Sequence, residues 1–129
     1  MFLSLLDEDQ RELLYHFAYS VVVSDGEFSA GEELLMADMR REMVLPEDFE
    51  PHYLEVKNLE LKFPTQRSRI VVAIALTHLG YADGAFEIEE KSYLHELCKV
   101  FDIDDELFTR INNWVRRLVA LHEEATNFL

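Results

Sequence analysis

A short acidic sequence occurs twice in this chain, and the copies lie 58 positions apart, counted from Asp25 to Asp83. Each copy is typical of a helix, an Asp-Gly turn and a second amphipathic helix. Two copies are fewer than the three or so that a stacked repeat array needs, so we expect a pseudo-twofold pair of helix-turn-helix units with neighbouring acidic turns. The first copy is Ser24-Asp25-Gly26-Glu27-Phe28 with Glu32, and the second is Ala82-Asp83-Gly84-Ala85-Phe86 with Glu90.

Apolar residues recur at helical spacing along most of the chain, and strand-like alternation is nearly absent. We therefore expect an all-α, bundle-like single domain over residues 1–129 with about six or seven helices. Repeat one is expected at about 8–45, repeat two at about 65–103, and a C-terminal helix at about 105–125.

Capping signals set the expected helix boundaries. Asp7 or Asp9 is expected to begin the first helix. Ser29 and Glu32 form the pattern of a capping box at the start of the second. Three prolines divide residues 46–64, where we expect one or two short helices at about 51–58 and a turn. The remaining start signals are Thr65, Glu87 and Asp104.

Three sets of side chains are expected in the core. The helix over 65–81 is apolar nearly all round, which predicts a central buried helix. Phe28 and Phe86 should point inwards beside the Asp-Gly turns. The inner stripe of the last helix is expected to consist of Leu107, Phe108, Ile111, Val115, Leu118 and His122.

The chain is strongly acidic, with 12 basic and 26 acidic residues and a formal net charge of −14. This charge disfavours nucleic acid and anionic lipid, and it favours cations or a protein partner with a basic surface. The single cysteine, Cys98, excludes an internal disulfide. The N-terminus lacks the basic region of a signal peptide, and the apolar run 70–79 is about half of the ~20 residues that a membrane span needs. We expect a cytoplasmic protein without direct membrane insertion.

Each Asp-Gly motif matches the second half of an EF-hand calcium loop but not the first half. The upstream ligand positions are occupied by Val21 and Val23 in one copy and by Leu79 and Tyr81 in the other. These side chains cannot coordinate a hard cation, so the sequence excludes a true EF-hand.

The paired turns nevertheless predict a divalent-cation site if they come together. Carboxylate oxygens suit Ca²⁺, Mg²⁺ or Mn²⁺ better than zinc or copper. The alternative is that the acidic residues only cap helix termini, which explains each copy separately. The predicted ligands are Asp25, Glu27, Glu32, Asp83, Glu87 and Glu90.

The helix followed by [Ser/Ala]-Asp-Gly-x-Phe-x-x-x-Glu and an amphipathic helix resembles the tellurite-resistance TerB and TerB-like family over roughly residues 8–122. The resemblance implies an all-helical fold with a duplicated core, an acidic metal-binding surface, a role in stress responses and no established catalysis. Asp25, Glu32, Asp83 and Glu90 match the acidic positions of the family. Ala85 departs from the pattern, because the first copy has Glu27 there.

No other motif predicts catalysis. Cys98 and His95 share a helix face, but no oxyanion donor can be named beside them. The five histidines form no short metal-binding pair, although His78 and His95 flank the second Asp-Gly motif. Two hypotheses therefore follow from the sequence: a non-enzymatic, cation-binding TerB-like stress protein, and an acidic protein-protein interaction module without a functional metal.

Overall fold

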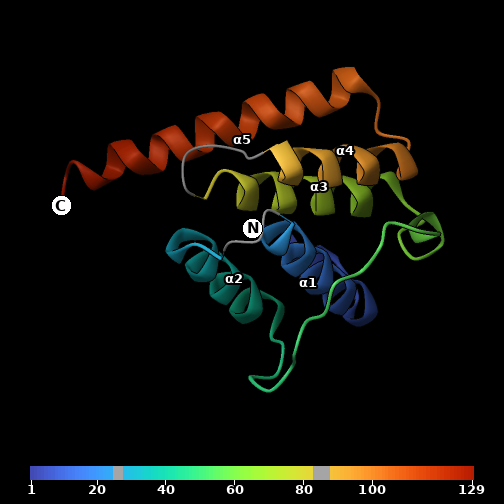
Figure 1. Cartoon of the computed structure of the whole chain (residues 1–129). Helices are drawn as coiled ribbons and strands as arrows, with labels where there is room; N and C mark the ends of the chain where they lie inside the picture. Colours follow the sequence, from blue (N-terminus) through green and yellow to red (C-terminus); the bar gives the residue numbers. More distant parts are fainter. Residues whose placement is uncertain (25–27, 83–87) are drawn as a thin grey trace.

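The computed structural model describes residues 1–24, 28–82 and 88–129, with the side chains of 88–90 excepted. Within these ranges the fold is all-helical and contains no strand, as the sequence predicted. Five α-helices and two single 3₁₀ turns are found there, whereas we expected six or seven helices (Figure 1). The elements are η1 (Leu3–Leu5), α1 (Glu8–Val23), α2 (Ala30–Met43), η2 (Leu59–Leu61), α3 (Gln66–Gly80), α4 (Ile88–Val100) and α5 (Asp105–Thr126).

Four helices begin at the predicted capping residues. Asp7 accepts a hydrogen bond from the N–H of Gln10 at 2.8 Å and starts α1. Ser29, Thr65 and Asp104 cap α2, α3 and α5 in the same way, each through a side-chain oxygen that accepts from a backbone N–H three residues on. These bonds satisfy donors that the first helical turn leaves without a partner, which explains why local sequence sets these boundaries.

The C-terminal ends of α2 and α4 have the same geometry. Val44 and Asp102 both adopt the left-handed conformation, with φ of 56° and 58°. The N–H groups of Val44 and Leu45 donate to carbonyls of the last turns of α2, and those of Asp102 and Ile103 do the same at α4. Each pair of bonds forms a Schellman motif. The two motifs lie 58 positions apart, which is the offset of the Asp-Gly motifs.

The core is built around α3, as predicted for an apolar central helix. α3 packs against α1, α2, α4, α5 and η1. A row of phenylalanine rings closes the end of the core near η2. Phe17 contacts Phe63 at a ring-centroid distance of 6.3 Å, and Phe63 contacts Phe101 at 5.5 Å. All three side chains are fully buried, so their apolar area anchors α1 and α4 to the segment that precedes α3.

The predicted helix at 51–58 is wrong, because this segment has no regular secondary structure. The N–H of Lys57 donates to the carbonyl of Glu55 within a tight turn, and the backbone of Leu54 bonds to side chains of neighbouring helices. The N–H of Leu54 donates to Ser20 Oγ at 2.9 Å, and the Tyr93 hydroxyl donates to the Leu54 carbonyl at 2.9 Å. Leu54 and Val56 turn inwards while the intervening Glu55 is exposed, so the period is two residues and not 3.6.

α5 packs on the bundle as far as Val119, which is half-buried against the core. Its buried residues are Ile111 and Val115, and every residue from 120 to 129 is exposed. Figure 1 shows the helix crossing the bundle beside α3 and α4 and continuing beyond it towards the C-terminus. The predicted inner stripe is wrong at His122, which is exposed although its ring faces that of His78 on α3.

Candidate functional site

The cation site predicted at the Asp-Gly turns lies mostly outside the described residues. Glu90 belongs to α4, but its side chain is outside them as well. Whether the two turns are neighbours therefore stays a prediction, as does the position of Phe86. The other predicted ligands outside the described ranges are Asp25, Glu27, Asp83 and Glu87.

Glu32 is the one predicted ligand whose side chain is described, and it caps α2. Its Oε1 accepts a hydrogen bond from the N–H of Ser29 at 3.1 Å, while Ser29 Oγ accepts from the N–H of Glu32 at 3.1 Å. The residue is only 5 % exposed. This reciprocal arrangement is the predicted capping box, and it accounts for a buried carboxylate at a positive helix end without a metal. Across residues 1–24, 28–82 and 88–129, no three His, Cys, Asp or Glu side chains are placed to hold an ion.

The expected inward orientation of Phe28 is wrong, since its side chain is 45 % exposed. Phe28 precedes the N-cap residue Ser29, and an apolar residue there is usually buried against the fourth helical residue. In α2 that residue is Glu33, which offers no apolar surface. Phe28 lies instead over an open groove that it shares with Tyr15 and Met36.

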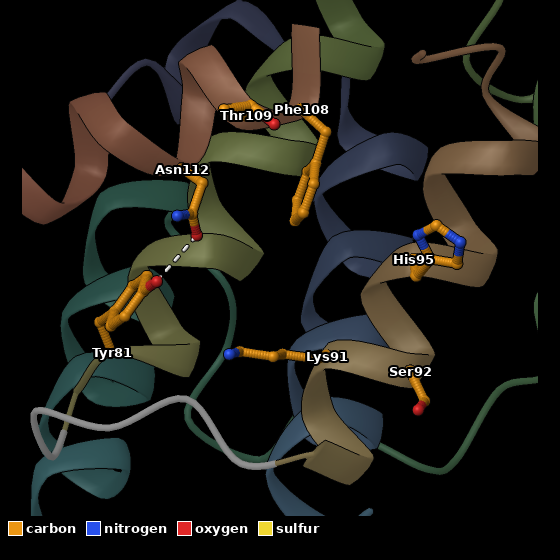
Figure 2. Close-up of a pocket in the computed structure, with 7 residues that line it drawn as sticks. All are labelled: Tyr81, Lys91, Ser92, His95, Phe108, Thr109 and Asn112. Carbon is orange, nitrogen blue, oxygen red and sulfur yellow. Dashed lines mark hydrogen bonds between the residues drawn. The ribbon is translucent and has the colours of Figure 1, made fainter. Parts of the chain in front are cut away.

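A pocket of about 440 Å³ lies between α4 and α5, beside the end of α3 (Figure 2). The Tyr81 hydroxyl donates to Asn112 Oδ1 at 2.9 Å and joins α3 to α5 at one wall. Figure 2 shows Lys91 reaching from α4 towards this wall, whereas His95 and Ser92 extend away from Tyr81. The lining residues are Tyr81, Lys91, Ser92, His95, Phe108, Thr109 and Asn112.

The charge of this pocket opposes a cation. Tyr81 and Lys91 flank the second Asp-Gly motif in the sequence, so the pocket lies next to one of the predicted half-sites. Among the described residues that line it, Lys91 alone is permanently charged, and an ammonium group repels a divalent ion. His95 lies at this pocket, as its position near the motif suggested, but it is exposed and forms no described ligand cluster.

A larger groove, of about 690 Å³, lies between the N-terminal turn and α5. η1 packs on α2 and α3, and the N–H of Leu3 donates to Glu42 Oε2 at 3.0 Å, so the turn is held in place. Phe2 thereby comes within 6.4 Å of Trp114, measured between ring centroids. We refer to this feature as the α5 groove; its lining residues are Phe2, Ile74, Leu107, Arg110, Ile111, Asn113, Trp114 and Arg117.

The α5 groove is apolar at its centre and basic at its rim. Phe2 is 45 % exposed and Trp114 is 36 % exposed, although both are large aromatic side chains. Both charged lining residues are arginines, Arg110 and Arg117, and no described carboxylate forms an ion pair with either. On a chain of net charge −14 this is a local reversal of sign. Net charge alone did not predict it; the arginine spacing at 110 and 117 on one helix face was the available signal.

Two histidine pairs form contacts that the sequence did not predict. His16 on α1 stacks on His52 with ring centroids 4.0 Å apart, and its Nδ1 accepts from the N–H of His52 at 3.0 Å. Burial and then the neighbouring His52 lower the pKa of His16. His78 faces His122 at 6.5 Å, and burial and then His122 lower the pKa of His78. The lowered pKa favours the neutral form of His16 and of His78 in the folded protein.

Cys98 is buried, as its helical phase predicted. Burial raises the pKa of its thiol to about 12, so the reactive thiolate is essentially absent at neutral pH. His95, the neighbour three residues earlier, is exposed, whereas Cys98 is buried. The two side chains therefore do not form a nucleophile and base of the kind that covalent catalysis requires.

Comparison with known proteins returned no significant match to a protein-family model, a curated protein or a solved structure. Among the described residues, no helix combines the length and the apolar character that crossing a membrane requires.

Proposed function

We propose that this chain is a non-enzymatic protein-protein interaction module that binds a helical segment of its partner in the α5 groove. The observation that carries the proposal is the exposure of Phe2 and Trp114 between two arginines on a strongly acidic chain. Exposed aromatic and arginine side chains are the types that dominate binding energy at protein interfaces.

The chemistry of the groove defines the partner segment. An amphipathic helix presents apolar residues at i, i+3, i+4 and i+7, and such a stripe fits an apolar groove. Arg110 and Arg117 lie seven residues apart, so they border the groove about two helical turns from each other. Acidic residues beside the apolar stripe of the partner would pair with them. The groove differs in charge from the acidic remainder of the surface, and it is for that acidic surface that the sequence predicted a basic partner.

We also infer that the fold is a TerB-like internal duplication. α1 begins at Glu8 and α3 at Gln66, an offset equal to that of the Asp-Gly motifs. The packing supports the same relation, because α1 contacts α2 as α3 contacts α4, and the cross pairs α1–α4 and α2–α3 are also in contact. The two Schellman motifs recur at the same offset.

Cation binding at the Asp-Gly turns, with the stress-response role that the TerB resemblance implies, is the second proposal. The two acidic motifs occur at equivalent places in the two helix pairs, which favours cation binding. Two observations weigh against cation binding. Glu32 already accepts a hydrogen bond in the capping box of α2, and the ammonium group of Lys91 lies in the pocket next to the second Asp-Gly motif. The groove therefore supports the interaction module more directly than the turns support a metal site.

Trp114 is the single tryptophan of the chain, so its fluorescence reports on the groove without interference. The probe is a synthetic helical peptide with leucines at i, i+3, i+4 and i+7 and glutamates flanking them. We expect a saturable shift of Trp114 emission to shorter wavelength. A matched peptide with lysines in place of the glutamates should bind at least about tenfold more weakly.

Two neighbouring arginines provide the control. Arg117→Ala should weaken binding of the glutamate peptide, because Arg117 lines the groove. Arg116→Ala should leave it unchanged, because Arg116 is exposed on the same helix but does not line the groove. Equal binding of both peptides, or no shift with either, would refute the proposal.

A further inference from the structure

The C-terminal half of α5 extends beyond the bundle and exposes large apolar side chains. Leu121 is 61 % exposed and Phe128, in the turn that ends the helix, is 83 % exposed. In proteins, most of the stability of a helix comes from packing its apolar face. In the last turns of α5 every residue from 120 onwards is exposed, and the contact of His122 with His78 is on a different face from Leu121; the turns nevertheless retain helical geometry to Thr126.

These apolar residues continue the face of α5 that borders the groove. From Arg110 to Phe128, a row of side chains recurs at intervals of four and three residues in turn. This spacing keeps the whole row on one side of the helix. We call this row the α5 stripe; its members are Arg110, Trp114, Arg117, Leu121, Glu124 and Phe128.

Beyond its acidic first turn, Asp105 and Glu106, α5 changes the sign of its charge along its length. Residues 107–117 contain three arginines and no carboxylate, whereas residues 118–128 contain Glu123 and Glu124 and neither lysine nor arginine. Arg110 and Arg117 line the groove, and the two glutamates lie in the exposed last turns. A helix with this division is complementary to a second copy of itself in antiparallel orientation.

We propose that two copies of this chain form an antiparallel dimer in which the projecting half of each α5 occupies the α5 groove of the other. With the twofold axis near Arg117 and Leu118, Trp114 of one copy meets Leu121 of the other. In the same register Arg110 lies near Glu124, and Leu107 lies near Phe128. This inference rests on the proposed function of the groove and assigns its occupant.

Self-complementarity favours a second copy over an unrelated helix. A twofold dimer uses the same patch on both subunits, so each contact occurs twice and the assembly closes. Each copy carries both the groove and, at the end of the same helix, the segment that would fill it. Two copies can therefore each place that segment in the groove of the other. The two Arg110–Glu124 contacts of the dimer make association compatible with a net charge of −14 per chain, and they offset the approach of the two Arg117 side chains at the twofold axis.

The first test compares two exposed leucines. Leu121→Asp places a carboxylate opposite Trp114, whereas Leu34→Asp makes the same change on α2, where Leu34 is 70 % exposed and far from the α5 stripe in sequence. By sedimentation equilibrium at micromolar concentrations, we expect the wild type and Leu34→Asp to be dimeric and Leu121→Asp to be monomeric. Circular dichroism should show that all three proteins are folded. A monomeric wild type, or a dimeric Leu121→Asp protein, would overturn the dimer.

The second test is charge reversal. Arg110→Glu and Glu124→Arg should each weaken dimerisation by about tenfold or more, because each creates two like-charge contacts per dimer. The double variant restores the pairing with its sign reversed and should recover most of the wild-type affinity. If the double variant lost as much dimerisation free energy as the two single variants together, the antiparallel register would be excluded.

The dimer and the proposed function can fail separately. Leu121→Asp leaves the groove residues of each monomer intact, so the glutamate peptide should still shift the Trp114 emission of this variant. A monomeric wild type that binds the peptide would overturn the dimer and retain the interaction module. A monomeric Leu121→Asp protein that does not bind the peptide would leave self-association as the sole role of the groove.

Discussion

Substitution of Glu32 separates its capping role from a role as a cation ligand. In Glu32→Gln the side chain can still accept the hydrogen bond from Ser29, since glutamine also forms capping boxes. Only the negative charge at the start of α2 is lost, which should cost about 0.3–1 kcal/mol of folding free energy. Glu32→Ala also removes the hydrogen bond of a side chain that is 5 % exposed, which adds roughly 0.5–1.5 kcal/mol.

These free energies are large enough to measure by thermal unfolding. For a chain of this length, 1 kcal/mol corresponds to roughly 3–5 °C in Tm. Glu33→Gln is the matched control, because Glu33 lies in the same first turn and is exposed. We expect Glu32→Gln and Glu33→Gln to lower Tm by similar amounts and Glu32→Ala to lower it further, in the presence of a chelator.

The opposite pattern would support a ligand role. If Glu32 belonged to a cluster of mutually repelling carboxylates, Glu32→Gln would raise the Tm of the metal-free protein and would abolish stabilisation by Ca²⁺ or Mg²⁺. A Glu32→Ala protein no less stable than Glu33→Gln would refute the capping role derived from the structure.

Three further outcomes are expected. Millimolar Ca²⁺ or Mg²⁺ should raise Tm more than NaCl of matched ionic strength if the Asp-Gly turns bind a cation, and Asp83→Asn should remove that excess; equal effects of both salts would contradict cation binding. Cys98 should react with thiol reagents only in denaturant, because burial raises its pKa to about 12, and rapid modification of the folded protein would show that α4 opens. Stability in urea should fall as the pH drops below 6.5, because the pKa of His16 is lowered in the folded state and the unfolded chain therefore binds more protons. His16→Asn keeps an acceptor for the N–H of His52 and should flatten part of this pH dependence; an unchanged slope would exclude His16 as its source.

The helix boundaries were predictable because they depend on neighbouring residues. Asp7, Ser29, Thr65 and Asp104 all cap the helices expected of them, since a side-chain cap reaches only three residues along the chain. The buried face of α3 was predictable for a similar reason, because periodicity determines which side chains share a helix face. The capping box of Glu32 was foreseen as an alternative to metal binding and is confirmed.

The failures occurred where distant residues compete with local preference. The segment 51–58 has a sequence compatible with a short helix, but Ser20 and Tyr93 bond the backbone of Leu54 instead. Phe28 is exposed because Glu33, and not an apolar residue, occupies the position against which it would pack. His122 has the phase of the core face and contacts His78, but it is exposed, as is every residue from 120 onwards.

The α5 groove shows the same division. The sequence by itself determined an amphipathic C-terminal helix and a strongly negative chain, because periodicity and charge are properties of the residues alone. Only the tertiary structure decided that η1 brings Phe2 to Trp114, that two arginines border the same groove, and that the last turns of α5 leave Leu121 exposed. A groove forms between elements that are distant in sequence, so its composition depends on how they pack and not on any local pattern.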